Sequence, residues 1–388
     1  MRILFYCDTV FSFGGVQRVL AEIAKALSGK HEVTILTTDT TCPDLSMYGY
    51  DKSAVRFESV SYTNSCWIER FLCRGYGFLY KNFFPDSRYA SSWYARTFFL
   101  PRYKRQLIGK INSGNYQVVV GVHAYLSLHL ASVKKEIPVA KIIGWMHNSY
   151  EAFFEKEKPY LPGLKGFFKY EMAELDGIVV LSHTDKEKYE KQLGLRPEVI
   201  YNPLTVEMKG RADLGSKRFL SVGRFSKGHK GFDILIRAFA VFAEKNSDWM
   251  LDIVGEGVEE ELYRSLISVN NLEHRICIHP FTKDIHPYYA RSSVYVLASR
   301  WEGMPLVLME AMAYGLPVIA SDIPIARELL QGKGMAVLFE KENINRLADC
   351  LQYMAAEADL NEMSEKSLAY AGSFKTDAMI EQWENMIN

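Results

Sequence analysis

Two glutamates, Glu302 and Glu310, form the pattern that most directly suggests chemistry in this sequence. They flank a predicted helix start, because an apolar run ends near Ser299, Pro305 suits a first helical position and Gly315 suits a helix end. One carboxylate then lies just before the helix and the other more than one turn inside it. The two side chains can therefore contact different parts of one ligand.

The start of this predicted helix is a candidate site for an anion such as a diphosphate. The first N–H groups of a helix have no partner within it, and the helix dipole favours negative charge there. A carboxylate repels phosphate, so we expect Glu302 and Glu310 to accept hydrogen bonds from sugar hydroxyls. The alternative makes Glu302 a solvated loop residue and Glu310 a helix-surface charge. The loop and helix start supply the remaining candidates, which are Gly303, Met304, Pro305, Leu306, Val307 and Leu308.

A second group of candidates lies in a glycine-bearing basic loop at 223–231. Arg224 follows a predicted strand and Lys230 precedes a predicted helix, so both cations can reach one point outside the sheet edge. A departing diphosphate gains negative charge, and cations placed there stabilise the transition state. The alternative interpretation is a solvated basic turn. We prefer the diphosphate role, because the loop accompanies the predicted anion-binding helix start.

The first half of the chain carries fewer signals. Gly14 and Gly15 allow a ligand to approach the backbone closely, although a glycine pair is weak by itself. His147 follows a predicted strand and would face the same cleft, and His123 follows another. The alternative for each histidine is a core residue whose ring is satisfied by neighbours, and for His123 we prefer it.

These candidates need a scaffold of parallel strands. The first half opens with a strand at 3–7, a glycine loop, a helix at 17–27 and a strand at 32–37, which is a parallel βαβ unit. Short β-branched runs predict three further strands, at 117–122, 140–145 and 177–181.

The same order of elements begins again near Lys217. The predictions are a helix at 232–245 and strands at 218–222, 249–254, 276–279, 294–298 and 317–320. A chain of 388 residues exceeds what one hydrophobic core organises. We therefore predict an α/β protein with two Rossmann-like, doubly wound parallel-sheet domains facing a central cleft. The predicted limits are 1–203 and 204–373, with a helix at 374–388 packing back toward the first domain.

Residues 67–105 depart from this regular pattern. The segment is rich in aromatic residues and carries eight basic residues against only Glu69 and Asp86. Such a composition is typical of interfacial helices on anionic lipid. The alternative is a helical insert packed on the first domain. The basic residues are Arg70, Arg74, Lys81, Arg88, Arg96, Arg102, Lys104 and Arg105.

Composition excludes several classes of protein. The balance of 46 basic and 46 acidic residues does not favour nucleic acid as a partner. The sequence has no Asp-x-Asp triplet, no Gly-x-Gly-x-x-Gly and no Walker loop, so we expect no metal site, no dehydrogenase and no phosphate-loop ATPase. Six cysteines without paired metal-ligand spacing indicate a reducing compartment. No apolar stretch is long enough for a membrane span, so we expect a cytoplasmic protein, soluble or peripheral at the inner face of the membrane.

Taken together, these motifs resemble the retaining glycosyltransferases of family 4, which have the GT-B fold. The resemblance covers most of the chain and is densest from Arg218 to Asp322. It rests on the Glu302 and Glu310 pair and on a surrounding frame of Gly303, Pro305, Ala311, Gly315, Pro317, Gly14-Gly15, Asn202-Pro203 and Gly255-Glu256-Gly257.

The resemblance implies a nucleotide-sugar site in the second domain and an acceptor side in the first. It implies that Arg224 and Lys230 bind the donor diphosphate, that Glu310 holds the ribose hydroxyls and that Glu302 contacts the transferred sugar. It also places His147 beside the anomeric centre and the Gly15 backbone on the phosphate side. Two features depart from the family pattern: Gln17 stands where many members have glutamate, and a longer basic loop lets Lys227 compete with Lys230 for the lysine role.

The activity implied is a metal-independent transfer with retention. A hexose or N-acetylhexosamine would pass from a nucleotide sugar, which we expect to be UDP-linked, to a hydroxyl of a lipid-linked or polysaccharide acceptor. The leaving phosphate oxygen would accept the acceptor's proton. The expected partners are the nucleotide sugar, the acceptor and an anionic membrane, and no cofactor is expected. The alternative is an inactive nucleotide-sugar-binding protein of the same fold.

Overall fold

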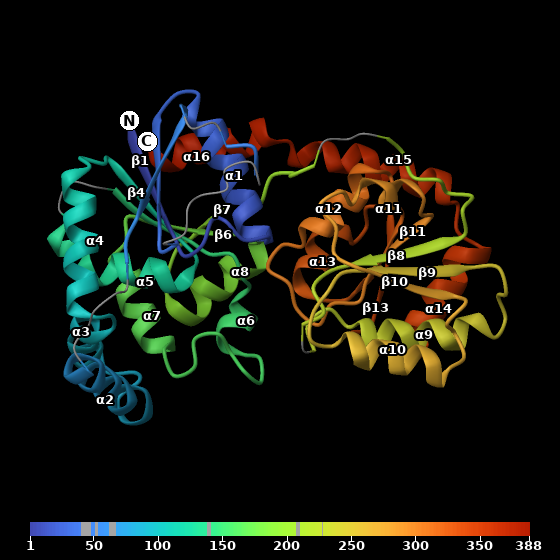
Figure 1. The fold of residues 1–388 in the computed structure, drawn as a ribbon, viewed down its shortest axis with the longest axis horizontal. Coiled ribbons are helices and arrows are strands. Elements are labelled where there is room, and N and C mark those ends of the chain that lie inside the picture. The colour runs from blue at the N-terminus through green and yellow to red at the C-terminus, as the bar shows by residue number, and fades with distance from the viewer. Residues whose placement is uncertain (40–47, 51–52, 62–66, 138–140, 207–209, 227) are drawn as a thin grey trace. The chain divides into compact units, whose positions relative to one another are not determined.

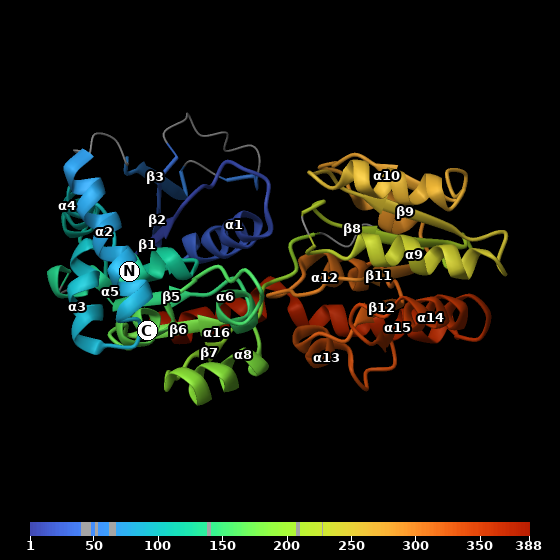
Figure 2. The same cartoon turned by 90° about the horizontal axis from the view of Figure 1, so that it is seen from below.

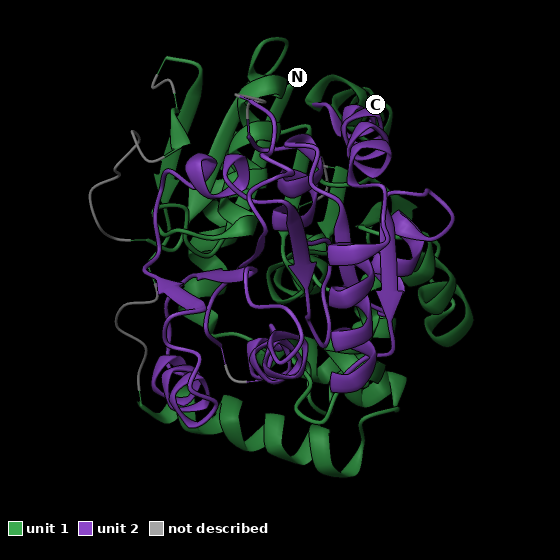
Figure 3. Cartoon of the chain, turned by 90° about the vertical axis from the view of Figure 1, so that its right-hand side faces the viewer, with its two compact units in different colours: residues 1–203, 376–388 green, residues 204–375 purple. Residues whose placement is uncertain are grey.

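The computed structural model describes the chain from residue 1 to 388, except residues 40–47, 51–52, 62–66, 138–140, 207–209 and 227. The chain forms two compact units, which Figure 3 shows in different colours. Unit 1 contains Met1–Pro203 and Thr376–Asn388, and unit 2 contains Leu204–Lys375.

Unit 1 is built on a seven-stranded parallel sheet in the order β3-β2-β1-β4-β5-β6-β7. Its strands are β1 (Arg2–Cys7), β2 (Glu32–Thr37), β3 (Val55–Ser59), β4 (Val118–Val122), β5 (Lys141–Trp145), β6 (Gly177–Val180) and β7 (Glu198–Val199). Its helices are α1 (Gly15–Ser28), α2 (Trp67–Phe83), α3 (Arg88–Thr97), α4 (Pro101–Ser113), α5 (Ala124–Val133), α6 (Tyr150–Phe154), α7 (Lys165–Met172), α8 (His183–Lys188) and α16 (Thr376–Ile387), with short turns η2 (Lys134–Glu136) and η3 (Tyr189–Leu193).

Hydrophobic spacing explains the opening βαβ unit. Helix α1 buries one face, including Leu20, Ile23 and Leu27, because these residues recur at helical spacing. Every residue of β4 is buried, as expected for a central strand covered on both faces. A Cβ at Gly121 would lie 2.8 Å from the Ser127 Cα, so glycine allows α5 to approach this strand closely.

The C-terminal helix α16 is part of unit 1. Trp383 is fully buried, and its ring lies 4.7 Å from that of Trp145 and 6.5 Å from that of Phe5. Glu384 accepts a hydrogen bond from His31 at 2.9 Å. The last helix therefore covers the unit 1 sheet beside α1.

The basic and aromatic segment at 67–105 forms α2, α3 and the start of α4, which Figures 1 and 2 show gathered at one side of unit 1. Its inner side is packed: the rings of Tyr94 and Phe98 each lie 4.8 Å from Phe167 of α7. Its outer side is not covered, since only Gly77 and Tyr80 are buried in α2. One segment thus both packs on the domain and leaves a helix face exposed.

His129 of α5 lies at the centre of the packed aromatic cluster. The Phe99 ring stacks on it with centroids 4.2 Å apart, and the Tyr6 hydroxyl lies 3.0 Å from its Nδ1. Only 1% of the residue is exposed, and this burial lowers the pKa of His129 to about 3. The folded chain therefore keeps the ring neutral in mild acid.

We expect acidification to destabilise unit 1 through His129. The unfolded chain protonates this ring below the ordinary pKa of 6.5, whereas the folded chain does so only near 3, so unfolding takes up a proton between these values. The free energy of unfolding should fall by up to about 1.4 kcal/mol for each pH unit in this window. Urea unfolding at several pH values measures the slope.

The variant His129→Gln should flatten this pH dependence even if it lowers stability at neutral pH. His274→Gln is the matched control, because that histidine is exposed and should leave the slope unchanged. Equal slopes for wild type and His129→Gln would contradict the assignment.

Unit 2 has a six-stranded parallel sheet in the order β10-β9-β8-β11-β12-β13. Its strands are β8 (Arg218–Val222), β9 (Met250–Val254), β10 (Ile276–His279), β11 (Val294–Leu297), β12 (Val318–Ser321) and β13 (Ala336–Phe339). Its helices are α9 (Phe232–Ala243), α10 (Glu260–Val269), α11 (His286–Ala290), α12 (Leu306–Ala313), α13 (Pro324–Leu330), α14 (Ile344–Ala356) and α15 (Leu360–Ala371), with the turn η4 (Gly372–Phe374).

Helices cover both faces of this second sheet. Figure 1 shows α9, α10 and α14 on one face and α11, α12 and α15 on the other. The first face carries the hydrophobic core, where Phe219, Leu251 and Leu347 are fully buried. Both units are therefore doubly wound α/β domains, and the predicted fold class is confirmed.

Candidate active site

The predicted anion-binding helix is α12, which begins at Leu306 after β11 and a loop at the carboxyl edge of the sheet. Pro305 is its N-cap residue, with φ −76° and ψ 104°, and not its first helical residue as predicted. The extended ψ explains the difference, because a helical residue needs a negative ψ. Gly315 ends the helix region with φ +77°, as its position predicts.

The backbone donors at this helix start differ in one respect from the prediction. The Leu308 N–H donates to the Pro305 carbonyl at 3.1 Å, so it is already used. In the described part of the chain, the N–H groups of Leu306 and Val307 donate no hydrogen bond. An anion at this end of α12 would therefore meet two donors rather than three.

The most informative contact joins the two sequence motifs. The Lys230 ammonium donates to Glu302 Oε1 at 2.6 Å, and Ser299 Oγ donates to the same oxygen at 2.6 Å. The side chains are only 14% and 8% exposed, so the pair is largely desolvated. Burial by itself would raise the pKa of Glu302, but the Lys230 and His229 charges outweigh it and the pKa lies below its ordinary value.

Glycines on either side of this pair allow the two loops to meet. A Cβ at Gly231, where φ is +66°, would lie 2.1 Å from the Ala298 carbonyl oxygen. A Cβ at Gly223 would lie 3.0 Å from the Lys230 Cε, so the lysine side chain lies close above this glycine. The close approach of two backbones thus sets the direction of Lys230.

Arg300 fixes the loop that carries Glu302. Its guanidinium donates to both carboxylate oxygens of Asp233, at 2.8 and 3.1 Å, and to Glu342 at 2.6 Å. It also donates to the Gly228 carbonyl at 3.2 Å. A bidentate guanidinium pair holds a planar geometry, so Arg300 locks the Glu302 loop to the basic loop and to the start of α9.

His229 is a site residue that the sequence prediction missed. Its ring stacks on Trp301 with centroids 4.7 Å apart, and its Nε2 lies 2.8 Å from the Trp301 carbonyl oxygen. The same nitrogen lies 3.8 Å from Glu302 Oε2. The position of His229 beside Lys230 was the only available signal, and a histidine in a glycine loop does not by itself indicate a contact.

Arg224 follows β8 and is exposed, at the same sheet edge as Lys230. The next residue, Phe225, is buried and its N–H donates to the Glu256 carbonyl at 2.8 Å. A Cβ at Gly257, where φ is +148°, would lie 2.4 Å from the Phe225 carbonyl oxygen. The Gly255-Glu256-Gly257 turn therefore supports the Arg224 loop. The competing candidate, Lys227, lies outside the described residues.

Glu310 is buried inside α12, with 1% of the residue exposed, so it is not the helix-surface charge of the alternative interpretation. Its Oε2 accepts a hydrogen bond from Tyr289 at 2.9 Å, and Thr205 Oγ1 lies 3.5 Å from its Oε1. Both contacts are neutral hydroxyl groups, which is the kind of donor that a ribose would also offer. Gly303 and Met304 are buried in the intervening loop.

The candidates of unit 1 gather at the carboxyl edge of its sheet. Gly14 is the N-cap of α1 and its N–H lies 3.2 Å from the Tyr48 hydroxyl, while Gly15 is the first helical residue. The Gln17 amide donates to the Thr9 carbonyl at 3.2 Å and lies over Gly14, where a Cβ would be 2.2 Å from the Gln17 Oε1. The side chain of Gln17, which stands where many family members have glutamate, thus lies folded over the glycine loop.

Two histidines follow the neighbouring strands β4 and β5. His147 is 7% exposed, and burial, with a further contribution from His123, lowers its pKa well below the ordinary value. Within the described residues its Nε2 has no hydrogen-bond partner. His123 has φ +92°, unusual for a side-chain-bearing residue, and burial lowers its pKa against the opposing charge of Asp8. Asp8, at the end of β1, was not predicted.

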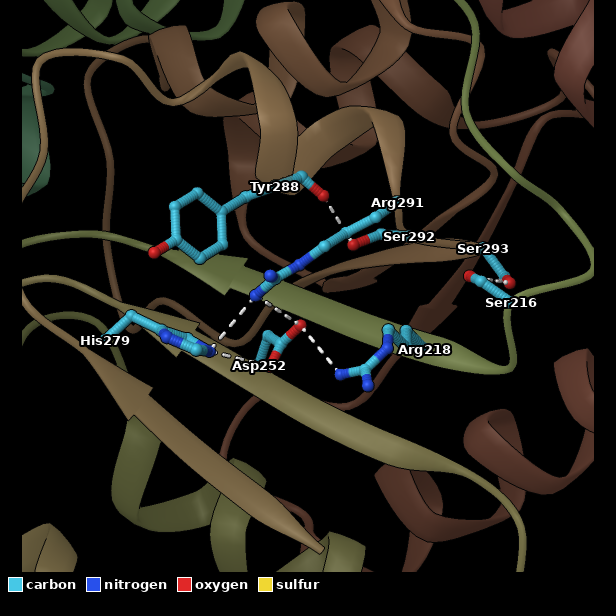
Figure 4. Close-up of polar contacts among 8 residues, drawn as sticks. All are labelled: Ser216, Arg218, Asp252, His279, Tyr288, Arg291, Ser292 and Ser293. Atoms are coloured by element: carbon cyan, nitrogen blue, oxygen red, sulfur yellow. Dashed lines mark hydrogen bonds and ion pairs between the residues drawn. The ribbon is translucent and has the colours of Figure 1, made fainter.

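Another cluster in unit 2 has the spacing of metal ligands. One ligand atom each from Asp252, Cys277 and His279 lies within 4.8 Å of the others. Figure 4 shows that the Asp252 carboxylate already pairs with Arg218 at 3.2 Å, Arg291 at 3.1 Å and His279 at 2.8 Å. Two guanidinium groups would repel a cation, so we interpret the cluster as an ion-pair network that joins the sheet to the end of α11.

Two doubly wound parallel sheets are the architecture of the GT-B fold, and cations and carboxylates meet at the carboxyl edge of the second sheet. The sequence profile of the family described as Glycosyltransferase Family 4 matches residues 13–207. The profile described as Glycosyl transferases group 1 matches residues 207–368. The chain belongs to this glycosyltransferase family.

Related sequences match part of the chain. An uncharacterized glycosyltransferase of Haemophilus influenzae is 35% identical over 216 residues, which is 55% of this chain and 61% of that protein. The N-acetylgalactosamine-N,N'-diacetylbacillosaminyl-diphospho-undecaprenol 4-alpha-N-acetylgalactosaminyltransferase of Campylobacter jejuni is 33% identical over 187 residues, covering 47% of this chain and 48% of the relative. The chain thus spans less than two thirds of these relatives.

Solved structures match along nearly the whole chain and confirm the fold. HepE from Anabaena, in complex with UDP and glucose, has a TM-score of 0.75 at 16% identity, covering 99% of this chain and 98% of HepE. Sucrose-phosphate synthase from Thermosynechococcus elongatus has a TM-score of 0.77 at 16% identity, covering 100% and 98%. Among the described residues, no helix is both long enough and apolar enough to cross a membrane.

Proposed function

We propose that this chain is a retaining, metal-independent glycosyltransferase. It moves a hexose or N-acetylhexosamine from a UDP-sugar to a hydroxyl of a lipid-linked or polysaccharide acceptor in cell-surface glycan biosynthesis. The observation that carries the proposal is the desolvated Lys230 and Glu302 pair beside the start of α12. It puts a cation, a carboxylate and helix N–H groups at one sheet edge.

These groups suit a nucleotide sugar in its separate parts. Lys230 has three N–H donors and uses one to hydrogen-bond Glu302, so two remain for a diphosphate. Arg224, on the same loop, would supply further donors to the diphosphate. The remaining lone pairs of Glu302 would accept hydroxyl groups of the transferred sugar. Glu310, whose described contacts include the Tyr289 and Thr205 hydroxyls, would accept those of the ribose. Positive charge at the leaving diphosphate stabilises the bond-breaking transition state.

The same charges support a reaction without a metal ion. A divalent cation would serve to neutralise the diphosphate, and Arg224 with Lys230 supplies two positive charges for this purpose. His147 belongs to the acceptor-side domain, and its lowered pKa keeps the ring neutral at physiological pH. A neutral imidazole can hydrogen-bond a sugar hydroxyl without repelling a developing oxocarbenium centre. In a front-face mechanism the leaving phosphate oxygen takes the acceptor's proton.

Relatives and structural neighbours support the substrate classes. The Campylobacter relative is named for transfer of N-acetylgalactosamine to a diphospho-undecaprenol-linked sugar, and HepE was solved with UDP and glucose. We therefore infer a UDP-sugar donor and a lipid-linked acceptor for this chain. A cytoplasmic location, with peripheral contact at the inner membrane face through α2, completes the proposal.

Release of UDP tests this function directly. Purified protein mixed with a panel of UDP-sugars and a membrane lipid extract should release UDP when the correct donor is present. Product analysis of the linkage then tests retention, and assays with a chelator test metal independence. Binding of UDP without any transfer across the panel would instead favour the inactive binding protein.

Removing the Arg224 guanidinium should weaken UDP binding and turnover together. Arg224→Ala deletes a cation that contacts the diphosphate in both ground and transition states, so we expect about a tenfold or greater loss in UDP affinity and a comparable loss in kcat/KM. Calorimetric titration with UDP and the release assay measure the two effects. Arg237→Ala, an exposed arginine on α9, is the matched control. Unchanged UDP affinity in Arg224→Ala would remove Arg224 from the site.

A further inference from the structure

Helix α2 presents its apolar residues to solvent, which is the reverse of an ordinary surface helix. Trp67 is 74% exposed, Phe71 70% and Phe78 63%. The whole exposed apolar set on α2 is Trp67, Ile68, Phe71, Leu72, Phe78, Leu79 and Phe83. Seven large apolar side chains exposed on one helix are typical of a binding surface in soluble proteins.

A stripe of cations borders this apolar face. Arg70, Arg74 and Lys81 are spaced by four and seven residues, which brings them to one side of the helix. In the described part of the chain, neither Arg74 nor Lys81 forms an ion pair with a carboxylate, and partial burial lowers the pKa of Lys81. Arg74 and Lys81 thus carry positive charge that no described carboxylate of unit 1 pairs with.

The side chains of Arg70, Arg74 and Lys81 line a cavity between α2 and residues 94–100, which run from α3 toward α4. The cavity has a volume of about 610 Å³, and Tyr94 and Phe98 form part of its opposite wall. None of its lining residues is acidic. A volume of this size suits a small ligand or the polar end of a larger one, and the charges require that end to be anionic.

We propose that this cavity binds the phosphate group of an anionic membrane lipid, while the exposed apolar side chains of α2 contact the lipid chains. The guanidinium groups of Arg70 and Arg74 and the Lys81 ammonium donate charge-assisted hydrogen bonds to the phosphate oxygens. The apolar face lies directly beside the cavity on the same helix, so one lipid satisfies both surfaces. The site lies wholly in unit 1 and deepens the membrane contact of the proposed function.

The adjoining surfaces favour a lipid over a soluble phosphate compound. A soluble phosphate would neutralise the cations but leave the rings of Trp67, Phe71 and Phe78 in water. A lipid bilayer takes up these rings and supplies the phosphate at the same depth, because cations and aromatic residues both lie in the headgroup region. Because the charged cavity adjoins an apolar helix face, we infer that the site binds a lipid headgroup.

Vesicle sedimentation of the full chain tests the site. Wild type should bind vesicles that contain phosphatidylglycerol and not vesicles of phosphatidylcholine alone. The double variant Arg74→Gln with Lys81→Gln should lower the partition coefficient about twenty-five-fold, because each cation near an anionic surface contributes roughly a fivefold factor. The matched control is Arg88→Gln with Arg105→Gln, which removes the same charge from exposed positions outside the cavity and should cost less than about threefold.

Thermal unfolding and UDP titration of each variant confirm that it is folded, and they report on the transferase site independently of vesicles. If the two double variants lose vesicle binding equally, the proposal is overturned, because binding would then depend on the total positive charge and not on the cavity. No binding of wild type to phosphatidylglycerol vesicles would overturn the proposal entirely. Calorimetric binding of inorganic phosphate without vesicle binding would also overturn it, by making the cavity a site for soluble phosphate. None of these outcomes depends on whether UDP is released in the transfer assay.

Discussion

Replacing Glu302 by alanine is expected to lower turnover by about a hundredfold or more, whereas UDP affinity stays the same or rises. The size follows from losing a preorganised, desolvated hydrogen-bond partner of the reacting sugar, which typically costs about two to three orders of magnitude in kcat. UDP itself lacks that sugar, so its binding does not use Glu302. The variant also frees the Lys230 ammonium from its 2.6 Å contact and leaves it available to the diphosphate.

Turnover is measured by UDP release with the donor that the panel identifies, and UDP affinity by calorimetry. Glu302→Gln should retain part of the activity, because an amide oxygen still accepts a hydroxyl and a lysine N–H but carries no charge. Glu261→Ala, an exposed glutamate on α10, should behave as wild type. Turnover of Glu302→Ala within about twofold of wild type would contradict the role of this residue.

Replacing Lys230 by alanine is expected to destabilise unit 2 and to abolish detectable transfer. Glu302 is 8% exposed, so the variant leaves a buried carboxylate without its cation, which typically costs about 3 kcal/mol or more. The diphosphate also loses a positive charge. The melting temperature and the denaturant midpoint measure stability, and the release assay measures activity.

The double variant Lys230→Ala with Glu302→Ala separates the two effects. Removing both charges leaves neither buried without a partner, so most of the lost stability should return, while activity should remain absent. A double variant as unstable as Lys230→Ala alone would show that the aliphatic part of the lysine, and not the ion pair, stabilises the loops. Recovery of activity in the double variant would contradict the diphosphate role of Lys230.

The central elements of both sheets were predictable from local patterns. The inner strands β2 and β8 and the edge strand β10 were predicted at the bounds that the structure shows, because short, mainly apolar runs between turn residues leave few alternatives. Strands β3, β7 and β13 were not predicted. Each lies at a sheet edge. Strand β3 carries charged residues and β7 has only two residues, so neither shows an apolar run, whereas β13 is apolar but only four residues long and was missed.

The candidate site was predicted in part. The sequence identified Glu302, Glu310, Arg224 and Lys230 and placed them at a sheet edge, because motif spacing and helix signals are local properties. It assigned Glu302 and Lys230 to separate parts of the donor and did not anticipate that they form an ion pair. It also missed His229 and Arg300, whose roles come from contacts with Trp301 and Asp233 that no spacing rule predicts.

The sequence by itself determined the order of elements, the two α/β domains and the identity of the charged groups, since each depends on residues that are neighbours along the chain. Only the tertiary structure decided that Lys230 meets Glu302 across 72 positions, that His147 is buried and neutral, and that α2 turns its aromatic face outward. The physical reason is that burial and pairing depend on how separate elements pack. A charge becomes desolvated, or an apolar face remains exposed, according to what other parts of the chain cover it.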